Sequence, residues 1–155
     1  MKPGSFTKLY IQLVFAVKYR ECLIHENFST ELYKYISGII SGKDHKSIIV
    51  NGMPDHIHVF LGLNPNVSIS DTVRDIKRSS SLFINVTDWL RKKFEWQDGY
   101  GAFSYSRSHL DNVYKYIQNQ KQHHAKHTFK QEYTGLLKKF EIEYDERFLF
   151  NFFDK

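Results

Sequence analysis

One stretch decides the fold, the run SIIVNGMPDHIHVFLGL at residues 47–63. Two apolar segments, Ser47–Val50 and His56–Leu63, flank Asn51-Gly52-Met53-Pro54-Asp55. Asn-Gly followed by Pro-Asp between two apolar runs is a strong hairpin signal. Every second residue from Ile57 onward is apolar, which is the period of a strand buried on one face. The stretch therefore predicts a β-hairpin.

Outward from the hairpin, hydrophobic periodicity predicts an alternation of strands and helices. Before the hairpin, the pattern predicts a strand at Leu9–Val17 and a helix from Asn27 or Ser29 to about Ser41. After it come a helix from Ser68 or Ser70 to about Lys93, and a strand, turn and strand at Phe94–Ser106 broken at Asp98-Gly99. The last predicted elements are a helix from Ser108 or Asp111 to about Thr128 and a helix around Tyr133–Phe140, in a tail that ends in Phe148, Phe150, Phe152 and Phe153. This order predicts an α+β protein whose sheet is covered by helices mainly on one face.

Length and composition limit the possible classes of protein. A chain of 155 residues with 41% hydrophobic residues predicts one globular domain, residues 1–155. The net charge of +5 slightly favours a polyanionic partner. The single cysteine, Cys22, excludes an internal disulfide and a cysteine-based zinc cluster, and it suits a reducing cytoplasm. No run approaches the roughly 18 apolar residues that a membrane helix needs.

Two histidines share one face of the predicted second hairpin strand. Ile57 and Val59 point towards the core, so His56 and His58 point together to the other face. Two imidazoles at this spacing can bind one divalent cation. The chain has eight histidines, so a His-x-His triplet also arises by chance, and a metal site needs a third ligand.

The predicted helix after Ser108 offers that ligand. Its inward stripe recurs at three- and four-residue steps, at Leu110, Val113, Tyr114 and Ile117. Tyr116 falls off this stripe, and Gln120 lies one turn further along the same side. A tyrosine can act as a nucleophile, and a glutamine carbonyl can ligate a hard cation.

Two alternatives to this pair stay open on the residues alone. Tyr114 and Gln118 have the same spacing as Tyr116 and Gln120, and only the apolar stripe, which takes Tyr114 as a packing residue, separates the two pairs. A tyrosine and a glutamine on the solvated face of an amphipathic helix also explain the pattern, and taken alone the pair fits that interpretation better.

Four motifs in order extend over nearly the whole chain. They are Tyr10-Ile11-Gln12-Leu13-Val14-Phe15-Ala16-Val17-Lys18, Asn51-Gly52-Met53-Pro54-Asp55-His56-Ile57-His58-Val59, Trp96-Gln97-Asp98-Gly99-Tyr100-Gly101-Ala102-Phe103-Ser104 and Tyr116-Ile117-Gln118-Asn119-Gln120-Lys121-Gln122-His123-His124. With these motifs the sequence resembles the single-tyrosine HUH transposases of small bacterial insertion sequences, including their repeat-associated domesticated relatives.

The resemblance implies a role for each matched residue. His56 and His58 match the two histidines of the HUH motif, Tyr116 matches the catalytic tyrosine, and Gln120 matches the third metal ligand. It also implies a ferredoxin-like sheet with helices on one side and a tyrosine-bearing C-terminal helix. Members are homodimers in which the tyrosine helix reaches the partner's histidines, so each active site is shared.

The implied activity is cleavage and rejoining of single-stranded DNA beside hairpins at the element ends. A divalent ion, Mg or Mn, would polarise the scissile phosphate, and attack by Tyr116 would give a 5′-phosphotyrosine and a free 3′-OH. Residues 115–130 hold four lysines and no acidic residue, which suits a phosphate-tracking face. The candidate DNA contacts are Lys77, Arg78, Lys115 and Lys121.

Alternative functions make different predictions. A domesticated, non-mobile protein would bind or process hairpins in single-stranded DNA, and a purely binding module would not need all of the four matched side chains. A nuclease that uses water would cleave DNA without a trapped protein–DNA adduct. A structural protein whose sheet is stabilised by a bound metal would unfold when the metal is chelated and would not bind DNA.

Overall fold

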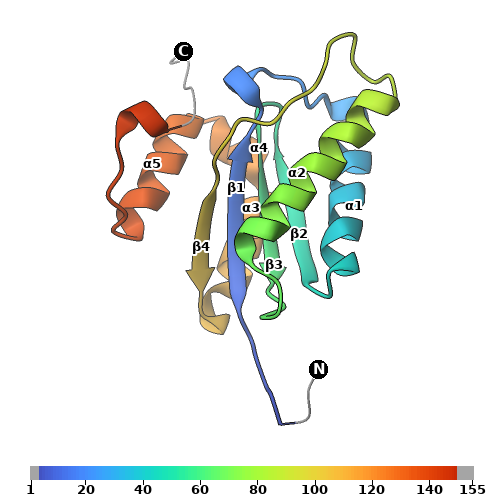
Figure 1. Ribbon diagram of the computed structural model, residues 1–155. Coiled ribbons are helices and arrows are strands. Elements are labelled where there is room, and N and C mark those ends of the chain that lie inside the picture. The colour runs from blue at the N-terminus through green and yellow to red at the C-terminus, as the bar shows by residue number, and fades with distance from the viewer. Residues whose placement is uncertain (1–3, 150–155) are drawn as a thin grey trace.

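Four antiparallel strands form one sheet in the computed structural model, which describes residues 4–149 (Figure 1). The strands are β1 (Tyr10–Ala16), β2 (Lys46–Met53), β3 (His56–Gly62) and β4 (Gly101–Tyr105). Their order is β2-β3-β1-β4. With a helix between β1 and β2 and another between β3 and β4, this is the ferredoxin-like arrangement. The predicted α+β class is therefore confirmed.

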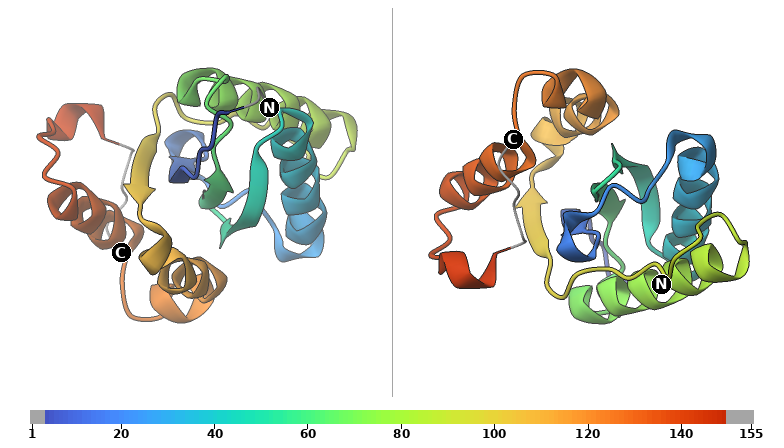
Figure 2. Two further views of the ribbon diagram at one scale, coloured as in Figure 1. Left: turned by 90° about the horizontal axis from the view of Figure 1, so that it is seen from below. Right: turned by 90° about the horizontal axis from the view of Figure 1, so that it is seen from above.

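Helices flank the sheet (Figures 1 and 2). Helices α1 (Glu26–Gly42) and α2 (Ile69–Val86) cover one face, α3 (Leu110–Gln118) and α4 (Gln120–His124) lie against the other, and α5 (Phe129–Lys139) lies beside β4. Short 3₁₀ helices in the described part of the chain span Lys18–Arg20, Arg107–His109 and Glu146–Phe148. Within residues 4–149, no helix combines the length and the apolar character that crossing a membrane requires.

The alternation along β3 separates two environments, as the sequence predicts. Ile57, Val59 and Leu61 are buried in the main core beneath α1 and α2. Phe60 faces the other way and forms a second, smaller cluster with residues of α3. His56 and His58 lie on that same second face, and both are completely buried.

The hairpin turn lies later in the chain than the sequence suggests. Asn51 and Gly52 belong to β2, and Met53 pairs directly with His56, so the turn consists of Pro54 and Asp55 alone. Gly52 serves a different purpose, because a Cβ there would lie 2.3 Å from the carbonyl oxygen of His56. The glycine permits close approach of two strands instead of a turn conformation.

Helix α2 is shorter than predicted. It ends at Val86 instead of about Lys93, and Asp88 has a positive φ of 57°. The chain turns back because Trp89 stacks on Phe28 of α1, with ring centroids 4.5 Å apart. The amide of Asn85 then binds both the N–H and the carbonyl of Phe94, which fixes the return of the chain.

The predicted pair of strands at Phe94–Ser106 is only half formed. Its second half is β4, but its first half contributes a single bridge between Trp96 and Val17. The indole of Trp96 donates to Ser80 of α2 at 2.9 Å, and the ammonium of Lys77 donates to the carbonyls of Gln97 and Gly99. These bonds attach the segment to α2, in addition to its backbone hydrogen bonds with the end of β1.

The predicted long helix from Ser108 to Thr128 is broken at Asn119, which has φ −98° and ψ 30°. The side-chain amide of Asn51 donates to the carbonyls of Ile117 and Gln118 at 2.9 and 3.2 Å, and so takes up groups at the end of α3. A capping box between Thr128 and Gln131 then begins α5, four residues before the predicted start. Phe148 is exposed in the last 3₁₀ helix, and Phe150, Phe152 and Phe153 lie outside the described residues.

Candidate metal and nucleophile site

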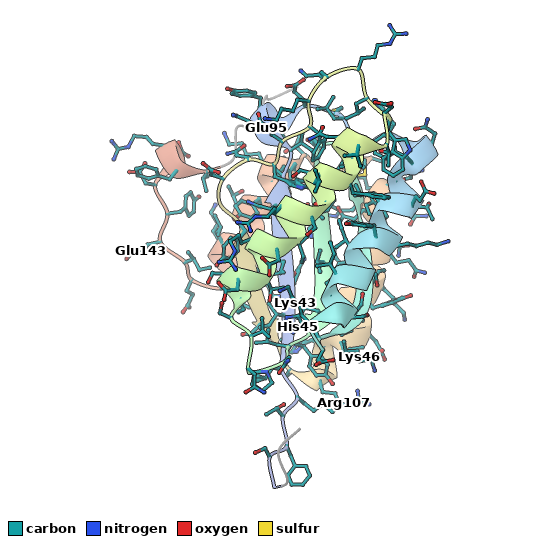
Figure 3. All side chains as sticks on the ribbon, turned by 45° about the vertical axis from the view of Figure 1, so that its right-hand side comes forward. Lys43, His45, Lys46, Glu95, Arg107 and Glu143 are labelled. Atoms are coloured by element: carbon teal, nitrogen blue, oxygen red, sulfur yellow. The ribbon has the colours of Figure 1, made fainter. Side chains whose placement is uncertain are left out.

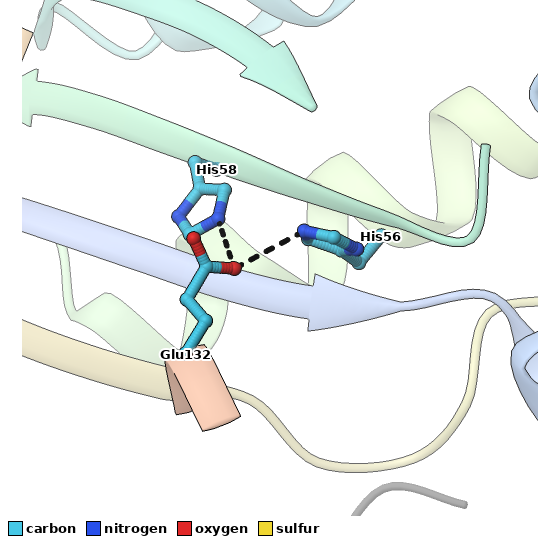
Figure 4. Close-up of side chains that lie close together, drawn as sticks. All are labelled: His56, His58 and Glu132. Atoms are coloured by element: carbon cyan, nitrogen blue, oxygen red, sulfur yellow. Dashed lines mark hydrogen bonds and ion pairs between the residues drawn. The ribbon is translucent and has the colours of Figure 1, made fainter. Parts of the chain in front are cut away.

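The two histidines of β3 form the floor of a buried polar cluster. Their rings lie 5.3 Å apart, because strand alternation points both side chains away from the apolar core. Both rings turn towards the carboxylate of Glu132 (Figure 4). The structure thus places two Nε2 atoms close enough to share one cation.

Gln120 approaches these histidines from the first residue of α4. Its Oε1 atom lies 3.3 Å from His56 Nε2, and the side chain is completely buried. The break at Asn119 reorients the chain just before Gln120, so α4 follows a new axis.

Tyr116 reaches the cluster from α3. Its ring centroid is 5.8 Å from that of His58, and its hydroxyl donates a hydrogen bond to Glu132 Oε2. The structure therefore brings Tyr116, His56, His58 and Gln120 together within a single chain. Tyr114 does not join them, and the prediction that it packs inward is wrong, because it is 36% exposed.

Glu132 was missed by the sequence analysis, although it contacts every other member of the cluster. Its side chain is 1% exposed, and Gln120 Nε2 donates to its Oε2 at 3.0 Å. Oε1 lies 3.0 Å from His58 Nε2 and 3.1 Å from His124 Nε2, while His123 Nε2 is 3.5 Å from Oε2. One signal could have found it, since Glu132 occupies an inward position three residues after Phe129 on α5.

Burial and hydrogen bonding shift the pKa values of the cluster. Burial alone would lower the pKa of His56, but bonds to Asp55 and Glu132 raise it to about 9. Burial alone would raise the pKa of Glu132, but the neighbouring imidazoles hold it well below its usual range. Burial and the Glu132 carboxylate raise the pKa of Tyr116 far above 10. A charged carboxylate here keeps the phenol protonated.

An outer layer orients the two histidines. His56 Nδ1 donates to Asp55 Oδ1 at 2.8 Å, and Arg20 Nε lies 2.9 Å from Asp55 Oδ2. Such a carboxylate–histidine pair is the usual support of a metal-binding imidazole. On His58, the amide of Gln12 donates to Nδ1 at 3.0 Å, and the Tyr105 hydroxyl donates to Gln12 Oε1 at 2.7 Å.

The donor set fits a divalent metal ion. His56, His58 and Glu132 each offer one ligand atom, and these atoms all lie within 4.8 Å of one another. Two imidazoles and a carboxylate suit first-row divalent ions such as Mn²⁺ and Zn²⁺. The cluster can therefore bind a metal, and the carboxylate comes from a helix outside the predicted motif.

The basic residues predicted to contact DNA lie in two different places. Lys77 and Arg78 are on α2, across the sheet from the histidines, and the Lys77 ammonium is bound by the carbonyls of Gln97 and Gly99. Lys115 is exposed on α3, and Lys121 is exposed on α4 in an ion pair with Glu26. Only Lys115 and Lys121 lie on the helices that carry Tyr116 and Gln120.

Comparison with known proteins gives consistent results. Residues 5–120 match the family described as "Transposase IS200 like". The ISDra2 transposase TnpA of Deinococcus radiodurans is 25% identical over 122 residues, which cover 76% of this chain and 87% of that protein.

Two solved structures share the fold. A putative transposase from Deinococcus radiodurans superposes with a TM-score of 0.63 at 24% identity, covering 77% of this chain and 96% of the other. A REP-associated tyrosine transposase bound to a REP hairpin gives 0.59 at 14% identity, covering 80% and 74% of the two chains. Glu132 lies beyond the residues that match the family.

Proposed function

The chain belongs to the family of IS200-like transposases, and from that premise we propose that it cuts and rejoins single-stranded DNA through Tyr116. Membership of the family makes it a transposase that cleaves DNA and transfers strands. The observation that carries the finer proposal is that Tyr116 lies beside His58 and donates its hydroxyl to Glu132, which also contacts His56 and Gln120. The substrate sites are hairpin-flanked element ends.

The proposed reaction keeps the energy of the phosphodiester bond. Tyr116 Oη attacks the scissile phosphorus, the bond from phosphorus to the 3′ oxygen breaks, and the 3′ oxygen leaves with a proton as a free 3′-OH. The 5′ phosphate stays on the tyrosine. The reverse attack by a 3′-OH then rejoins DNA without ATP. A divalent ion, Mg or Mn, held by His56, His58 and Gln120 would neutralise charge on the phosphate.

Glu132 holds the nucleophile in its orientation. The Tyr116 hydroxyl donates to Glu132 Oε2, and the same oxygen accepts from Gln120 Nε2 at 3.0 Å. The phenol is thus aimed at the cluster before substrate arrives. A hollow of about 580 Å³ opens beside Tyr116 and is lined by His123, Lys126 and His127, which suits the approach of a phosphate.

The surface charge supports a single-stranded DNA partner. Lys115 and Lys121 flank the nucleophile, and both are exposed. A larger hollow of about 1080 Å³ at the other end of the sheet is lined by Lys8, Lys46 and Arg107; Figure 3 shows the last two at that end of the molecule. Basic groups at both ends of this face suit a substrate that extends from a hairpin to the scissile phosphate.

A single domain and a homodimer are further parts of the proposal. Tyr133 and Leu137 of α5 are buried in the same core as Phe103 of β4, which supports one domain for residues 1–155. In the proposed dimer, α3 of each subunit places its Tyr116 beside the histidines of the other subunit. This contact replaces the one between Tyr116 and the histidines of its own chain. A protein that only binds or processes hairpins, without mobility, is the alternative.

The test is a covalent adduct. Incubation with single-stranded hairpin DNA from the element end and Mg or Mn is expected to give a protein–DNA band that survives denaturation. Tyr116→Phe abolishes it, lowering the yield by a factor on the order of 10³ or more. Tyr114→Phe, the matched control, keeps it. An adduct in Tyr116→Phe, or cleavage without any adduct, contradicts the proposal.

The shared site has its own test. A His56→Ala/His58→Ala double variant retains the tyrosine, and Tyr116→Phe retains the histidines. When the two inactive proteins are unfolded, mixed and refolded together, the mixture is expected to form adduct again. In a mixed dimer, one of the two sites combines the intact tyrosine of one variant with the intact histidines of the other. No recovery, together with a monomer in sedimentation at micromolar concentration, contradicts the dimer but leaves the tyrosine chemistry standing.

A further inference from the structure

A hollow of about 600 Å³ lies between α1 and α4, outside the buried cluster around Glu132. The end of β2 and the hairpin turn complete its walls, and α4 contacts β2. His124 lines this hollow, and its Nε2 lies 3.1 Å from Glu132 Oε1. One side chain therefore separates the hollow from the cluster. The volume is within the range of roughly 300–1,000 Å³ that is typical of ligand sites.

A further hollow lies between this one and the hollow beside the nucleophile. It has a volume of about 370 Å³ and shares Met53, Pro54 and His124 with the hollow between α1 and α4. On its other side it shares Lys126 with the hollow of about 580 Å³ beside Tyr116. The three hollows therefore follow one another around the end of α4. Lys126 is exposed and forms no ion pair with another residue of the range 4–149, so its ammonium is available to a phosphate.

The walls of the hollow between α1 and α4 combine apolar side chains with hydroxyl groups. The apolar side chains are those of Ile24, Met53 and Pro54, and the hydroxyl groups of α1 are those of Ser29, Thr30 and Tyr33. The two charged residues in the walls, Lys121 and Glu26, form an ion pair, so their charges cancel. An unpaired nucleobase has two apolar faces and an edge of hydrogen-bonding groups. The hollow therefore suits a neutral base better than a phosphate.

Tyr33 offers an unused hydroxyl in this wall. Its ring packs against the main core, and the side chain is half-buried. Among the residues that the structure describes, its hydroxyl has no hydrogen-bond partner, whereas Ser29 Oγ donates to the carbonyl of Glu26 at 3.3 Å. Burial raises the pKa of Tyr33, so the phenol keeps its proton and can both donate and accept a hydrogen bond.

We propose that the hollow between α1 and α4 holds an unpaired base of the DNA strand that carries the scissile phosphate, with the Tyr33 hydroxyl bonded to the edge of that base. The strand passes from Tyr116 along Lys126, which contacts a phosphate, to the hollow. This inference rests on the proposed function for its single-stranded substrate. It adds that the protein itself recognises a nucleotide near the cleavage point, because a site that hydrogen-bonds one base rejects a base without the matching group.

The test measures the affinity of the full chain for single-stranded DNA from the element end. Fluorescence anisotropy follows binding without added metal, so that no strand is cut. Tyr33→Phe is expected to weaken the affinity about three- to tenfold, which corresponds to the loss of one hydrogen bond. Tyr35→Phe is the matched control, because Tyr35 also belongs to α1 but its ring stacks on Phe83 of α2. Its affinity is expected to equal that of the wild type.

An abasic scan of the DNA identifies the nucleotide that occupies the hollow. Each nucleotide beside the cleavage point is replaced in turn by one that lacks its base. In the wild type, the loss of the base at one position is expected to weaken binding about tenfold or more. In Tyr33→Phe, the effect at that position is expected to be smaller and the effects at the other positions unchanged, because both changes remove the same hydrogen bond.

A second variant fills the hollow. Thr30 is exposed on α1 and lines the hollow, so the indole of Thr30→Trp is expected to occupy the space of the base. This variant is expected to bind DNA more weakly and to lose the effect of the missing base at the identified position. Ser41→Trp, at an exposed residue near the other end of α1, is the matched control and is expected to bind as the wild type does. Circular dichroism shows that each variant is folded.

Each outcome has a separate meaning. Weaker binding by Tyr33→Phe, with a smaller effect of the missing base at one position, supports the inference. Unchanged affinity, an unchanged abasic scan or an equal loss in Tyr35→Phe overturns it, since Tyr33 then makes no specific contact with a base. In those cases the adduct through Tyr116 still forms, and the proposed function stands. A wild type that binds no single-stranded DNA overturns the inference and the proposed function together.

Discussion

The two faces of the sheet differ in the origin of their stability, although the same strand β3 supplies both. On one face, Ile57, Val59 and Leu61 are buried among apolar residues of α1 and α2. On the other, His56 and His58 are equally buried but surrounded by polar groups of α3, α4 and α5. The first face stabilises the fold through the removal of apolar surface from water. The second holds the reactive groups.

Burial has opposite consequences on the two faces. A fully buried leucine or isoleucine contributes roughly 1.5–3 kcal/mol. A buried imidazole or carboxylate costs free energy unless each polar atom finds a partner. The polar face has such partners. Hydrogen bonds run from Tyr105 to Gln12 and from Gln12 to His58, and His56 donates to Asp55. We therefore expect damage to one face to leave the other largely intact.

The largest expected effect is on the apolar face. Leu61→Ala removes a side chain that is 1% exposed. The free energy of unfolding is expected to fall by about 3–5 kcal/mol, because a cavity remains where the methyl groups packed. Urea unfolding measures this loss. The Mn²⁺ affinity of the folded fraction is expected to stay that of the wild type. A matching fall in affinity would show that the two faces are not independent.

Gly52→Ala is expected to harm both faces together. An added Cβ would lie 2.3 Å from the His56 carbonyl oxygen and 2.8 Å from Ile57 Cα, both of which are backbone atoms. The strands must separate, at a cost of about 3 kcal/mol, the upper end of what overpacking usually costs. Thermal unfolding and Mn²⁺ titration measure the two effects. Gly38→Ala, a control inside α1 with open space at Cβ, is expected to leave Mn²⁺ binding unchanged and to raise stability by up to about 1 kcal/mol.

Metal binding is expected to stabilise the polar face. With Mn²⁺ at a hundred times its dissociation constant, the free energy of unfolding rises by about 2.7 kcal/mol. Addition of a chelator reverses the gain, and His56→Ala/His58→Ala shows none. The same gain is expected in Leu61→Ala, since separate sites add. A gain that persists in the double histidine variant would place the ion elsewhere.

Lys77→Met is expected to have a smaller effect. Lys77 donates to the carbonyls of Gln97 and Gly99 at 2.7 and 2.8 Å, and it is part-buried. Methionine keeps the apolar stem but loses both bonds, at a cost of about 1–2 kcal/mol after allowance for solvent. Chemical unfolding measures this, with Arg78→Met as the exposed control. An unchanged stability would show that the loop does not depend on the ammonium.

The same residue predicts a pH dependence. Burial lowers the pKa of Lys77 to about 8 from an ordinary value of 10.5. Between these values the unfolded chain holds a proton that the folded chain has released, so stability rises with pH in this window. Wild type is therefore expected to gain stability relative to Lys77→Met from about pH 8 to 10.5. A flat difference across that window contradicts the assignment.

Local patterns predicted the parts of the molecule that depend on local geometry. The alternation of β3 predicted both faces. Tyr116 and Gln120 do lie together at the histidines, but a break at Asn119 separates them, so they do not share one helix, and the inward packing expected of Tyr114 was wrong. Their catalytic and metal-binding roles stay predictions. The order of the elements was enough for the α+β class because few topologies satisfy it.

Features fixed by contacts between distant segments could not be predicted from local patterns. The early end of α2 depends on the stacking of Trp89 on Phe28, and the break at Asn119, between α3 and α4, depends on Asn51 of β2. Glu132 is the clearest case, because a glutamate in a tail helix has no local signature of contact with a histidine 74 residues earlier. Only its place in the buried stripe of α5 distinguishes it.

The smallest expected effect lies on the rim of the polar face. Lys115→Ala removes an exposed charge beside the nucleophile, so the free energy of unfolding should change by less than about 0.5 kcal/mol. If Lys115 contacts a phosphate, the slope of log affinity for single-stranded DNA against log salt falls by about 0.7. Filter binding at several salt concentrations measures the slope.

Arg78→Ala, on the other side of the sheet, tests whether that face also contacts DNA. The salt-dependence slope of this variant is reduced only if Arg78 contacts a phosphate. An unchanged slope in Lys115→Ala would remove this lysine from the DNA path without affecting the buried cluster.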